Sequence, residues 1–140
     1  MTRTENSKTT YPNLTSCCQD SLDPQRCARE MSLWNAGYRC VAGIDEVGRG
    51  PLAGPVTAAA VVFQPTSRFE QLVGVRDSKK LTARERTRLD VEIKKASATW
   101  GIGWASAEEI DDVGIVTATA RAMERCVLKL SPKPDYLLVD

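Results

Sequence analysis

The chain has 140 residues, of which 42% are hydrophobic and 26% are charged, and its 19 Lys and Arg residues oppose 18 Asp and Glu residues. These values fit one modest globular domain and exclude a disordered chain, a fibrous repeat and a pair of catalytic domains. The formal charge of +1 means that any affinity for nucleic acid comes from local clusters. The sequence contains no histidine, which excludes Ser-His-Asp catalysis, Cys-His catalysis and histidine-bound zinc.

The first 26 residues differ in composition from the rest of the chain. They are polar and show no helical or alternating apolar period, which predicts a flexible leader of residues 1–26 before a domain of residues 27–140. The five cysteines form no Cys-x-x-Cys pair, and the sequence has no secretory signal and no membrane span. We therefore expect reduced thiols in a cytoplasmic protein, with Cys40 and Cys126 as small core residues.

The first half of the domain predicts one helix and two strands. Residues 27–36 are typical of a short amphipathic helix that ends at Gly37. Residues 39–45 predict a strand, and the Gly-rich and Pro-rich stretch 48–55 predicts a tight irregular loop. The apolar run 56–63 then predicts a largely buried strand.

The second half predicts helices that begin with capping boxes, in which a hydroxyl and a carboxylate three residues later satisfy free backbone N–H groups. The box Thr82–Glu85 opens a helix to about residue 96, and the box Ser106–Glu109 opens a short helix. Further elements are a strand at 100–105, a helix from about 113 to the stop at Ser131-Pro132, and a buried strand at 136–139. This order predicts an α/β fold with a mixed sheet flanked by helices.

Three acids follow apolar strands. Asp45 and Glu46 stand directly before the glycine-rich loop, and Asp140 closes the strand 136–139. Carboxylates at neighbouring strand ends suit hard divalent cations, so we expect Asp140 to lie beside the acidic doublet and to share a metal pair with it. Adjacent strand residues point to opposite faces, so Asp45 and Glu46 serve one site only where the strand twists or ends. The alternative is a solvated doublet at a strand edge and a terminal acid that contacts nothing.

Basic residues are concentrated between Arg76 and Lys95, where eight basic residues oppose four acidic ones, an excess of four. Such an excess can hold a phosphate backbone, and Lys79 and Lys80 in the loop before the helix are the preferred candidates. The alternative is an ordinary solvated helix face.

Other large side chains receive no functional role from the sequence. Trp34, Trp100 and Trp104 are predicted to be packing residues rather than platforms for bases. Arg121 and Arg125 lie four residues apart and are predicted to flank Glu124 in solvent.

The motifs together resemble a known family. The run 41–56, VAGIDEVGRGPLAGPV, and the run 77–81, DSKKL, are similar to two motifs of bacterial ribonuclease HII. The segments 109–111 and 134–140 continue the likeness, which covers about residues 33–140. The resemblance implies a ribonuclease H-like fold and an endonuclease that cuts the RNA strand of RNA–DNA hybrids. It also implies cleavage at single ribonucleotides embedded in duplex DNA, with 5′-phosphate and 3′-hydroxyl products.

The resemblance implies a metal-dependent catalytic site. Asp45, Glu46 and Asp140 match the acids that bind Mn2+ or Mg2+ in that family, and they are the expected catalytic residues of a two-metal mechanism. Such a mechanism explains how a chain without histidine can hydrolyse a phosphodiester.

The resemblance also implies residues that bind the substrate. Gly48, Arg49 and Gly50 match the loop that reads the ribose 2′-hydroxyl, largely through backbone groups. Ser78 and Lys79 match residues that hold the backbone phosphates. The expected partner is an RNA–DNA hybrid, or a DNA duplex with an embedded ribonucleotide, and we expect a monomer that does not bind membranes.

The sequence departs from the family pattern in two ways. Gly114 replaces a common Asn, which is expected to loosen the start of the following helix. The family continues beyond the position of Asp140 with another strand, a fourth acidic ligand, a tyrosine and C-terminal helices. We therefore expect a catalytic domain truncated at its C-terminus, with weak or no cleavage by these 140 residues alone. The alternatives are a non-catalytic hybrid-binding fragment and ribonuclease HIII, which the arginine in the glycine loop disfavours.

Overall fold

A computed structural model describes residues 27–51, 53–65, 67 and 72–140, so the predicted leader lies outside the described residues. The predicted helices and strands are all present with small shifts at their ends, and one further 3-10 turn, η4, forms where the sequence predicts a loop. In chain order they are α1 (Ala28–Asn35), β1 (Val41–Val47), β2 (Val56–Val62), η4 (Ser78–Lys80), α2 (Ala83–Ala96), β3 (Thr99–Ala105), α3 (Ala107–Val113), α4 (Ile115–Leu128) and β4 (Tyr136–Val139).

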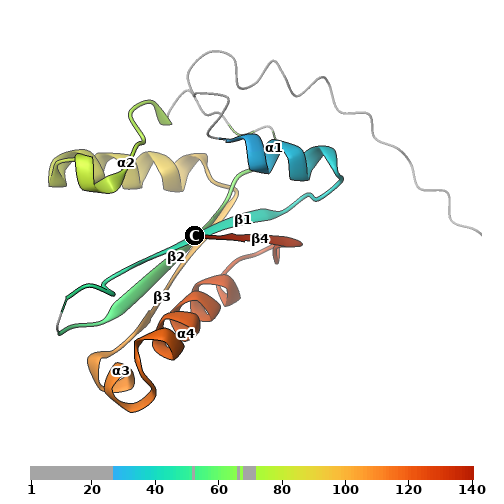
Figure 1. Cartoon of the computed structure of the whole chain (residues 1–140). Helices are drawn as coiled ribbons and strands as arrows, with labels where there is room; N and C mark the ends of the chain where they lie inside the picture. Colours follow the sequence, from blue (N-terminus) through green and yellow to red (C-terminus); the bar gives the residue numbers. More distant parts are fainter. Residues whose placement is uncertain (1–26, 52, 66, 68–71) are drawn as a thin grey trace, which may run out of the picture.

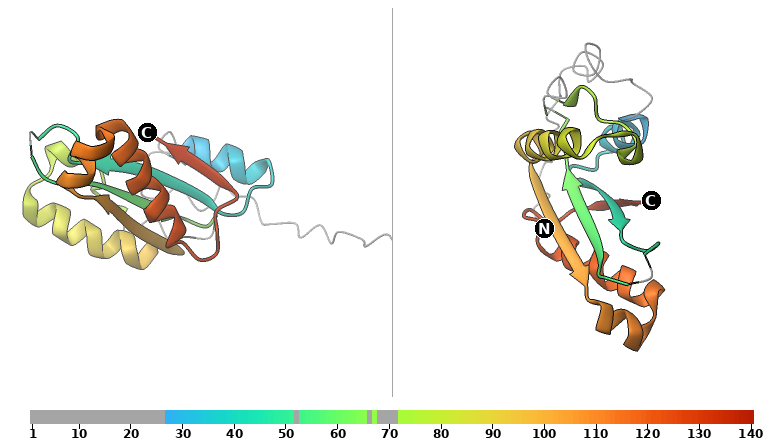
Figure 2. Two further views of the ribbon diagram at one scale, coloured as in Figure 1. Left: turned by 90° about the horizontal axis from the view of Figure 1, so that it is seen from below. Right: turned by 90° about the vertical axis from the view of Figure 1, so that its left-hand side faces the viewer.

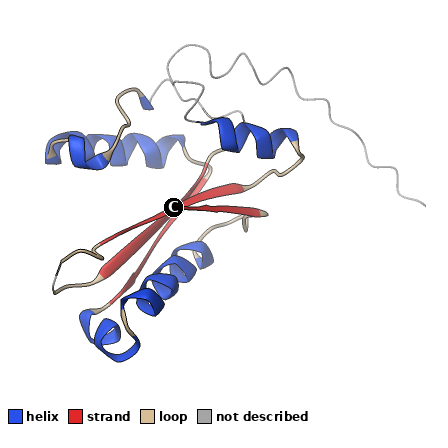
Figure 3. Ribbon diagram, in the orientation of Figure 1, coloured by secondary structure: helices blue, strands red, loops and turns tan. Residues whose placement is uncertain are grey.

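The four strands form one mixed sheet in the order β3-β2-β1-β4. β1 and β2 pair antiparallel, as do β2 and β3, whereas β4 lies parallel to β1. Figure 1 and Figure 3 show α1 and α2 on one side of this sheet and α3 and α4 on the other. The predicted α/β fold with a mixed sheet flanked by helices is confirmed.

The larger core layer lies between the sheet and α4. Two glycines of β3 permit this contact, because a Cβ on Gly101 would overlap the carbonyl oxygen of Cys126 and a Cβ on Gly103 would overlap that of Ala122. Cys40 and Cys126 are buried here as predicted, and burial raises the pKa of both thiols. The buried residues of this layer are Cys40, Ala42, Ile44, Val56, Ala58, Ala60, Val62, Ala105, Ala118, Ala122, Cys126 and Leu130.

The smaller core layer lies on the other face, under α1 and α2. Its buried members are Trp34, Val41 and Leu72, so the packing role predicted for Trp34 is confirmed. The predicted capping box of α2 is complete, because the Glu85 N–H donates to Thr82 Oγ1 at 3.3 Å and the Thr82 N–H donates to Glu85 Oε2 at 2.7 Å.

Trp100 and Trp104 are not packing residues, so that prediction is wrong. Their side chains lie on the α1 and α2 face of β3 and are 42% and 56% exposed. Alternation along the strand predicts which residues share a face but not what covers it. On β3 the covered face carries Gly101, Gly103 and Ala105, and the tryptophans occupy the open one.

β4 is an edge strand rather than the buried strand that its apolar sequence predicts. Among the described residues it pairs with β1 alone, and Leu137 and Val139 are 43% and 56% exposed. Asp135 holds its start against β1, since the N–H groups of Arg39 and Cys40 donate to the two carboxylate oxygens of Asp135 at 2.8 and 3.0 Å. Among the described residues, no helix combines the length and the apolar character needed to cross a bilayer.

Candidate active site

Asp45 and Asp140 come level with each other on neighbouring parallel strands, Asp45 within β1 and Asp140 directly after β4. In the register of β1 and β4, Ile44 lies opposite Val139, and the Asp140 N–H donates to the Ile44 carbonyl at 3.2 Å. The next residue on each strand therefore projects from the same side of the sheet. Both acids line one pocket of about 620 Å³, which confirms the predicted adjacency of the two strands.

The pocket around the two acids is lined by residues of four elements, α1, β1, β2 and β4. The backbone of the next residue orients the Asp45 carboxylate, because the Glu46 N–H donates to Asp45 Oδ1 at 2.7 Å. Arg29 and Glu30 of α1 also line the pocket. The sequence predicts the helix that carries them but contains no signal that places this helix above the acids, so neither residue was a candidate.

Glu46 is separated from the other two acids. β1 continues to Val47, so the alternation of side chains persists and Glu46 does not line the pocket of Asp45. Its side chain is only 18% exposed and forms an ion pair with Arg49, with Arg49 Nη1 at 3.2 Å from Glu46 Oε1. Across the described parts of the chain, no three Asp, Glu, Cys or His side chains gather closely enough to hold a metal ion. The structure thus brings together two of the three predicted acids.

The two acids that meet have the chemistry of a hard-cation site. Their donors are carboxylate oxygens, which Mg2+ and Mn2+ prefer over nitrogen and sulfur ligands. Within the described chain, Asp140 has no side-chain hydrogen bond or ion pair, so its oxygens are available. The donor set of Asp45 and Asp140 therefore fits a divalent ion.

The glycine loop follows β1 directly. Gly48 has φ +100°, and a Cβ there would lie 2.5 Å from the Pro55 carbonyl oxygen, so both its conformation and its surroundings require glycine. A Cβ on Gly50 would meet no atom within 4 Å, which leaves its backbone open to a ligand. The loop shares a small pocket of about 210 Å³ with Asp111 of α3, to which the sequence assigned no role.

Ser78 and Lys79 lie in η4, at the same end of the molecule as the glycine loop in Figures 1 and 2. Asp77 caps this turn by accepting the Lys79 N–H at 3.0 Å. Arg86 Nη1 donates to the carbonyls of Ser78 at 3.3 Å and Leu81 at 2.6 Å. These contacts use backbone atoms, so the exposed side chains of Ser78 and Lys79 point to solvent without a partner in the described chain.

Arg121 and Arg125 form ion pairs with Glu109, so the prediction that they flank Glu124 in solvent is wrong. Arg121 Nη1 lies 3.0 Å from Glu109 Oε1, and Arg125 binds both Glu109 oxygens at 2.7 and 2.9 Å. These arginines hold the pKa of the Glu109 carboxyl below its usual range. The second capping box forms only in part, because Ser106 accepts the Glu109 N–H at 3.2 Å while the Glu109 carboxylate turns to the arginines.

Comparisons with known proteins identify the family of this chain. The family model Ribonuclease HII matches residues 42–140. The ribonuclease HII of Syntrophotalea carbinolica is 50% identical over 111 residues, which cover 79% of this chain and 52% of the relative. The ribonuclease HII of Ruegeria sp. is 56% identical over 104 residues, which cover 74% and 44%. The chain spans about half the length of the curated relatives it matches.

Solved structures show the same fold. The ribonuclease H2 of Pyrococcus horikoshii OT3 superposes with a TM-score of 0.63 at 30% identity over 72% of this chain and 49% of that one. Bst-RNase HIII in complex with Mn2+ superposes with a TM-score of 0.53 at 22% identity over 73% of this chain and 36% of that one. The second likeness concerns the fold alone. With the family model matched from β1 to the end of β4, this chain belongs to the ribonuclease HII family.

Proposed function

We propose that this chain carries part of the catalytic site of an endonuclease that hydrolyses the RNA strand of RNA–DNA hybrids, including single ribonucleotides embedded in duplex DNA. The observation that carries the proposal is the meeting of Asp45 and Asp140, from neighbouring parallel strands, in one pocket. Membership of the ribonuclease HII family supports the same reaction class.

The proposed cofactor is Mn2+ or Mg2+, held by Asp45 and Asp140. The Mn2+ complex of the ribonuclease HIII neighbour supports a divalent ion in this fold. When bound, such ions supply an activated water and stabilise negative charge on the leaving oxygen, so the proposed products carry 5′-phosphate and 3′-hydroxyl ends. We propose Glu46 as the third ligand, which requires its carboxylate to leave Arg49.

The substrate contacts are proposed from the elements at the same end of the sheet. The backbone of Gly48, Arg49 and Gly50 approaches the ribose 2′-hydroxyl, an approach supported by the open space at Gly50. Ser78 and Lys79 hold phosphates and position the strand without reading its sequence. A substrate of this kind lies with bacterial DNA, so we propose a cytoplasmic location.

One observation favours a second candidate, a hybrid-binding module that does not cleave. Glu46 is committed to Arg49 and faces away from Asp45, so the described residues assemble a two-acid site rather than a three-acid site. A two-metal reaction needs more carboxylate ligands than this.

Cleavage of labelled oligonucleotides with Mn2+ separates the two candidates. The substrates are an RNA–DNA hybrid and a duplex with one ribonucleotide, and the chain is tested both alone and fused to the C-terminal half of the Syntrophotalea carbinolica relative. We expect Asp45→Asn to reduce cleavage by more than about 100-fold, since the loss of outer partners of a metal site alone costs about 10- to 100-fold. Val116→Ala, on the outside of α4, is the control. Binding without cleavage in both forms would favour the non-catalytic module.

A further inference from the structure

The outer edge of β3, on the side away from β2, is an unpaired strand edge. In the strand order β3-β2-β1-β4, β3 pairs with β2 alone among the described residues. Such an edge presents a row of backbone N–H and C=O groups to which a strand of another chain can pair. Trp100, Ile102 and Trp104 are also 42%, 37% and 56% exposed along this strand of seven residues. A long apolar edge of this kind favours aggregation unless the protein blocks it.

The register of the sheet determines which backbone groups of β3 point outward. The Asp140 N–H donates to the Ile44 carbonyl, so the even-numbered residues of β1 direct their backbone groups to β4. Because this direction alternates along a strand, the odd-numbered residues of β1 and β2 bond each other, and the even-numbered residues of β2 bond β3. Their partners are the odd-numbered residues of β3. The N–H and C=O groups of Trp100, Ile102 and Trp104 therefore point out from the edge.

Two cations at the C-terminal end of α4 cover two of these outward carbonyls. Lys129 Nζ donates to the Ile102 carbonyl at 2.6 Å, and Arg125 Nη1 donates to the Trp104 carbonyl at 2.7 Å. Lys129 makes no other side-chain hydrogen bond within the described chain, so its ammonium group serves this edge alone. The two carbonyls are two residues apart, which makes them successive acceptors along the edge. An incoming strand would have to displace both cations.

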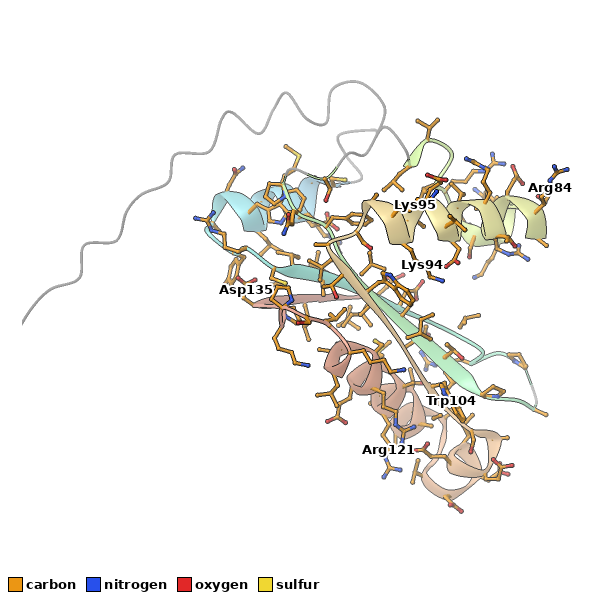
Figure 4. The ribbon with its side chains drawn as sticks, turned by 180° about the vertical axis from the view of Figure 1, so that it is seen from behind. Arg84, Lys94, Lys95, Trp104, Arg121 and Asp135 are labelled. Carbon is orange, nitrogen blue, oxygen red and sulfur yellow. The ribbon has the colours of Figure 1, made fainter. Side chains whose placement is uncertain are left out.

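A third cation lies beside the strand on the opposite face of the sheet. Lys94 Nζ forms an ion pair with Asp90 at 2.7 Å and lies 4.6 Å from the centre of the Trp100 ring. Figure 4 shows Lys94 pointing from α2 toward the sheet. Charged side chains, lysine above all, are a common means by which proteins block strand edges. Charge therefore flanks β3 on both faces, but only the α4 cations bind its outward backbone groups.

We propose that Arg125 and Lys129 cap the β3 edge against pairing with the β3 edge of a second copy of this chain. Two antiparallel β3 edges related by a twofold axis would place Ile102 opposite Ile102 and Trp100 opposite Trp104. Their apolar side chains would then pack side by side on one face. This pairing needs the two carbonyls that Lys129 and Arg125 occupy. The caps prevent a self-complementary contact that the β3 sequence otherwise favours, and this role is independent of the proposed function.

Sedimentation velocity over a range of chain concentrations measures the self-association. Lys129→Met keeps an unbranched side chain but removes the charge. We expect it to tighten self-association by at least about 10-fold, because a symmetric dimer frees one charge-assisted hydrogen bond in each copy. Adding Arg125→Met should tighten it further. Lys133→Met is the matched control and should behave as the native chain, because Lys133 Nζ donates to the Leu128 carbonyl at 2.6 Å, a helix carbonyl rather than a strand edge.

Two further variants locate the contact. In the Lys129→Met chain, Ile102→Lys would place two lysines opposite each other at the centre of the pairing, so we expect self-association to return to the native level. Glu109→Gln removes the ion pairs of Arg125 but leaves its hydrogen bond to the Trp104 carbonyl, so this variant should associate no more than the native chain.

Two outcomes would overturn the proposal. One is native sedimentation of both the Lys129→Met chain and the double variant with unchanged circular dichroism. The other is association that persists after Ile102→Lys. Where the double variant fails to fold, the Lys129→Met chain alone decides, since its substitution removes a single hydrogen bond. The exposed edge of β4 is the same in every variant, so association through β4 would appear equally in all of them and in the native chain.

Discussion

The two faces of the sheet use their side chains in different ways. On the α4 face the helix backbone touches β3 at Gly101 and Gly103, and Arg125 and Lys129 bind the β3 carbonyls of Trp104 and Ile102 at 2.7 and 2.6 Å. On the α1 and α2 face, Asp45 and Asp140 line a pocket and Trp104 is 56% exposed. The fold is therefore held mainly from one face, which leaves the other free for chemistry.

The α4 face of the sheet is the closed face, and the α1 and α2 face is the open face. Among the variants considered, we expect Gly103→Ala to destabilise the closed face most. The added Cβ would overlap the Ala122 carbonyl oxygen, which is backbone and cannot rotate away. We expect α4 to shift from the sheet at a loss of about 3 kcal/mol in the free energy of unfolding, at the upper end for overpacked cores. Urea unfolding followed by circular dichroism measures this loss.

Gly43→Ala is the matched control on the open face. Gly43 is also a strand glycine, but a Cβ there would meet no atom within 4 Å. We expect a change of less than about 1 kcal/mol. Equal losses for the two glycine variants would show that α4 does not hold the sheet by backbone contact.

Asp135→Ala tests how the pairing of the strands supports the candidate site, because Asp135 anchors the start of β4 and Asp140 follows its end. The variant leaves the N–H groups of Arg39 and Cys40 without their carboxylate acceptor, a loss of about 2 kcal/mol for charge-assisted hydrogen bonds. Calorimetric titration with Mn2+ should show weaker binding as β4 loosens. Asp135→Asn keeps one acceptor oxygen, so its stability and its Mn2+ affinity should lie between those of the native chain and those of Asp135→Ala. Unchanged Mn2+ affinity in Asp135→Ala would show that Asp140 does not need this anchor.

We expect acid pH to lower the stability of the closed face, because it protonates Glu109 and removes its ion pairs. Its two arginines lower the pKa of the folded carboxyl, so the stabilisation is complete above the unfolded pKa and is lost as the pH falls through the folded pKa. Glu109→Gln should therefore be less stable than the native chain at neutral pH and equally stable at strongly acid pH. The pKa of Glu85 is also lowered, by Thr82, so the difference between the two chains isolates Glu109. A constant difference at every pH would contradict the ion-pair account.

Sequence patterns predicted the local structure well, but they did not predict which surfaces other helices and strands would cover. Thr82 and Glu85 are three residues apart, and their capping box follows from that spacing alone. The contact between Glu109 and Arg125 joins residues that are 16 positions apart and lie in different helices, so no periodicity in the sequence predicts it. Apolar character likewise predicted β4 as a strand, but it could not tell that Leu137 and Val139 would be exposed in the described structure.

The candidate site shows the same division. The adjacency of Asp45 and Asp140 was predicted from two apolar runs that each lead to an acid, a pattern visible in the sequence. The separation of Glu46 depends on whether β1 ends at Asp45 or continues to Val47, and strand ends are the least certain part of a sequence prediction. The glycines of β3 did carry a signal, because glycine within a strand often marks a close approach of another backbone.

The smallest expected effect comes from removing one cation from each face. Arg84→Gln removes a side chain that points to solvent, and Arg125→Gln removes one that binds Glu109 and the Trp104 carbonyl. We expect Arg84→Gln to keep the native midpoint of urea unfolding and to weaken binding of an RNA–DNA hybrid a few-fold. Arg125→Gln should lower the midpoint and leave binding unchanged.

Salt dependence decides whether the Arg84 effect is a phosphate contact. Each phosphate neutralised on a duplex adds about 0.9 to the magnitude of the slope of log affinity against log salt, so Arg84→Gln should lower that magnitude by about this amount. Loss of affinity without a change in slope would point to altered structure instead. If Arg125→Gln lowered the slope as well, the cations of both faces would meet the nucleic acid, and the division of the sheet into a closed and an open face would fail.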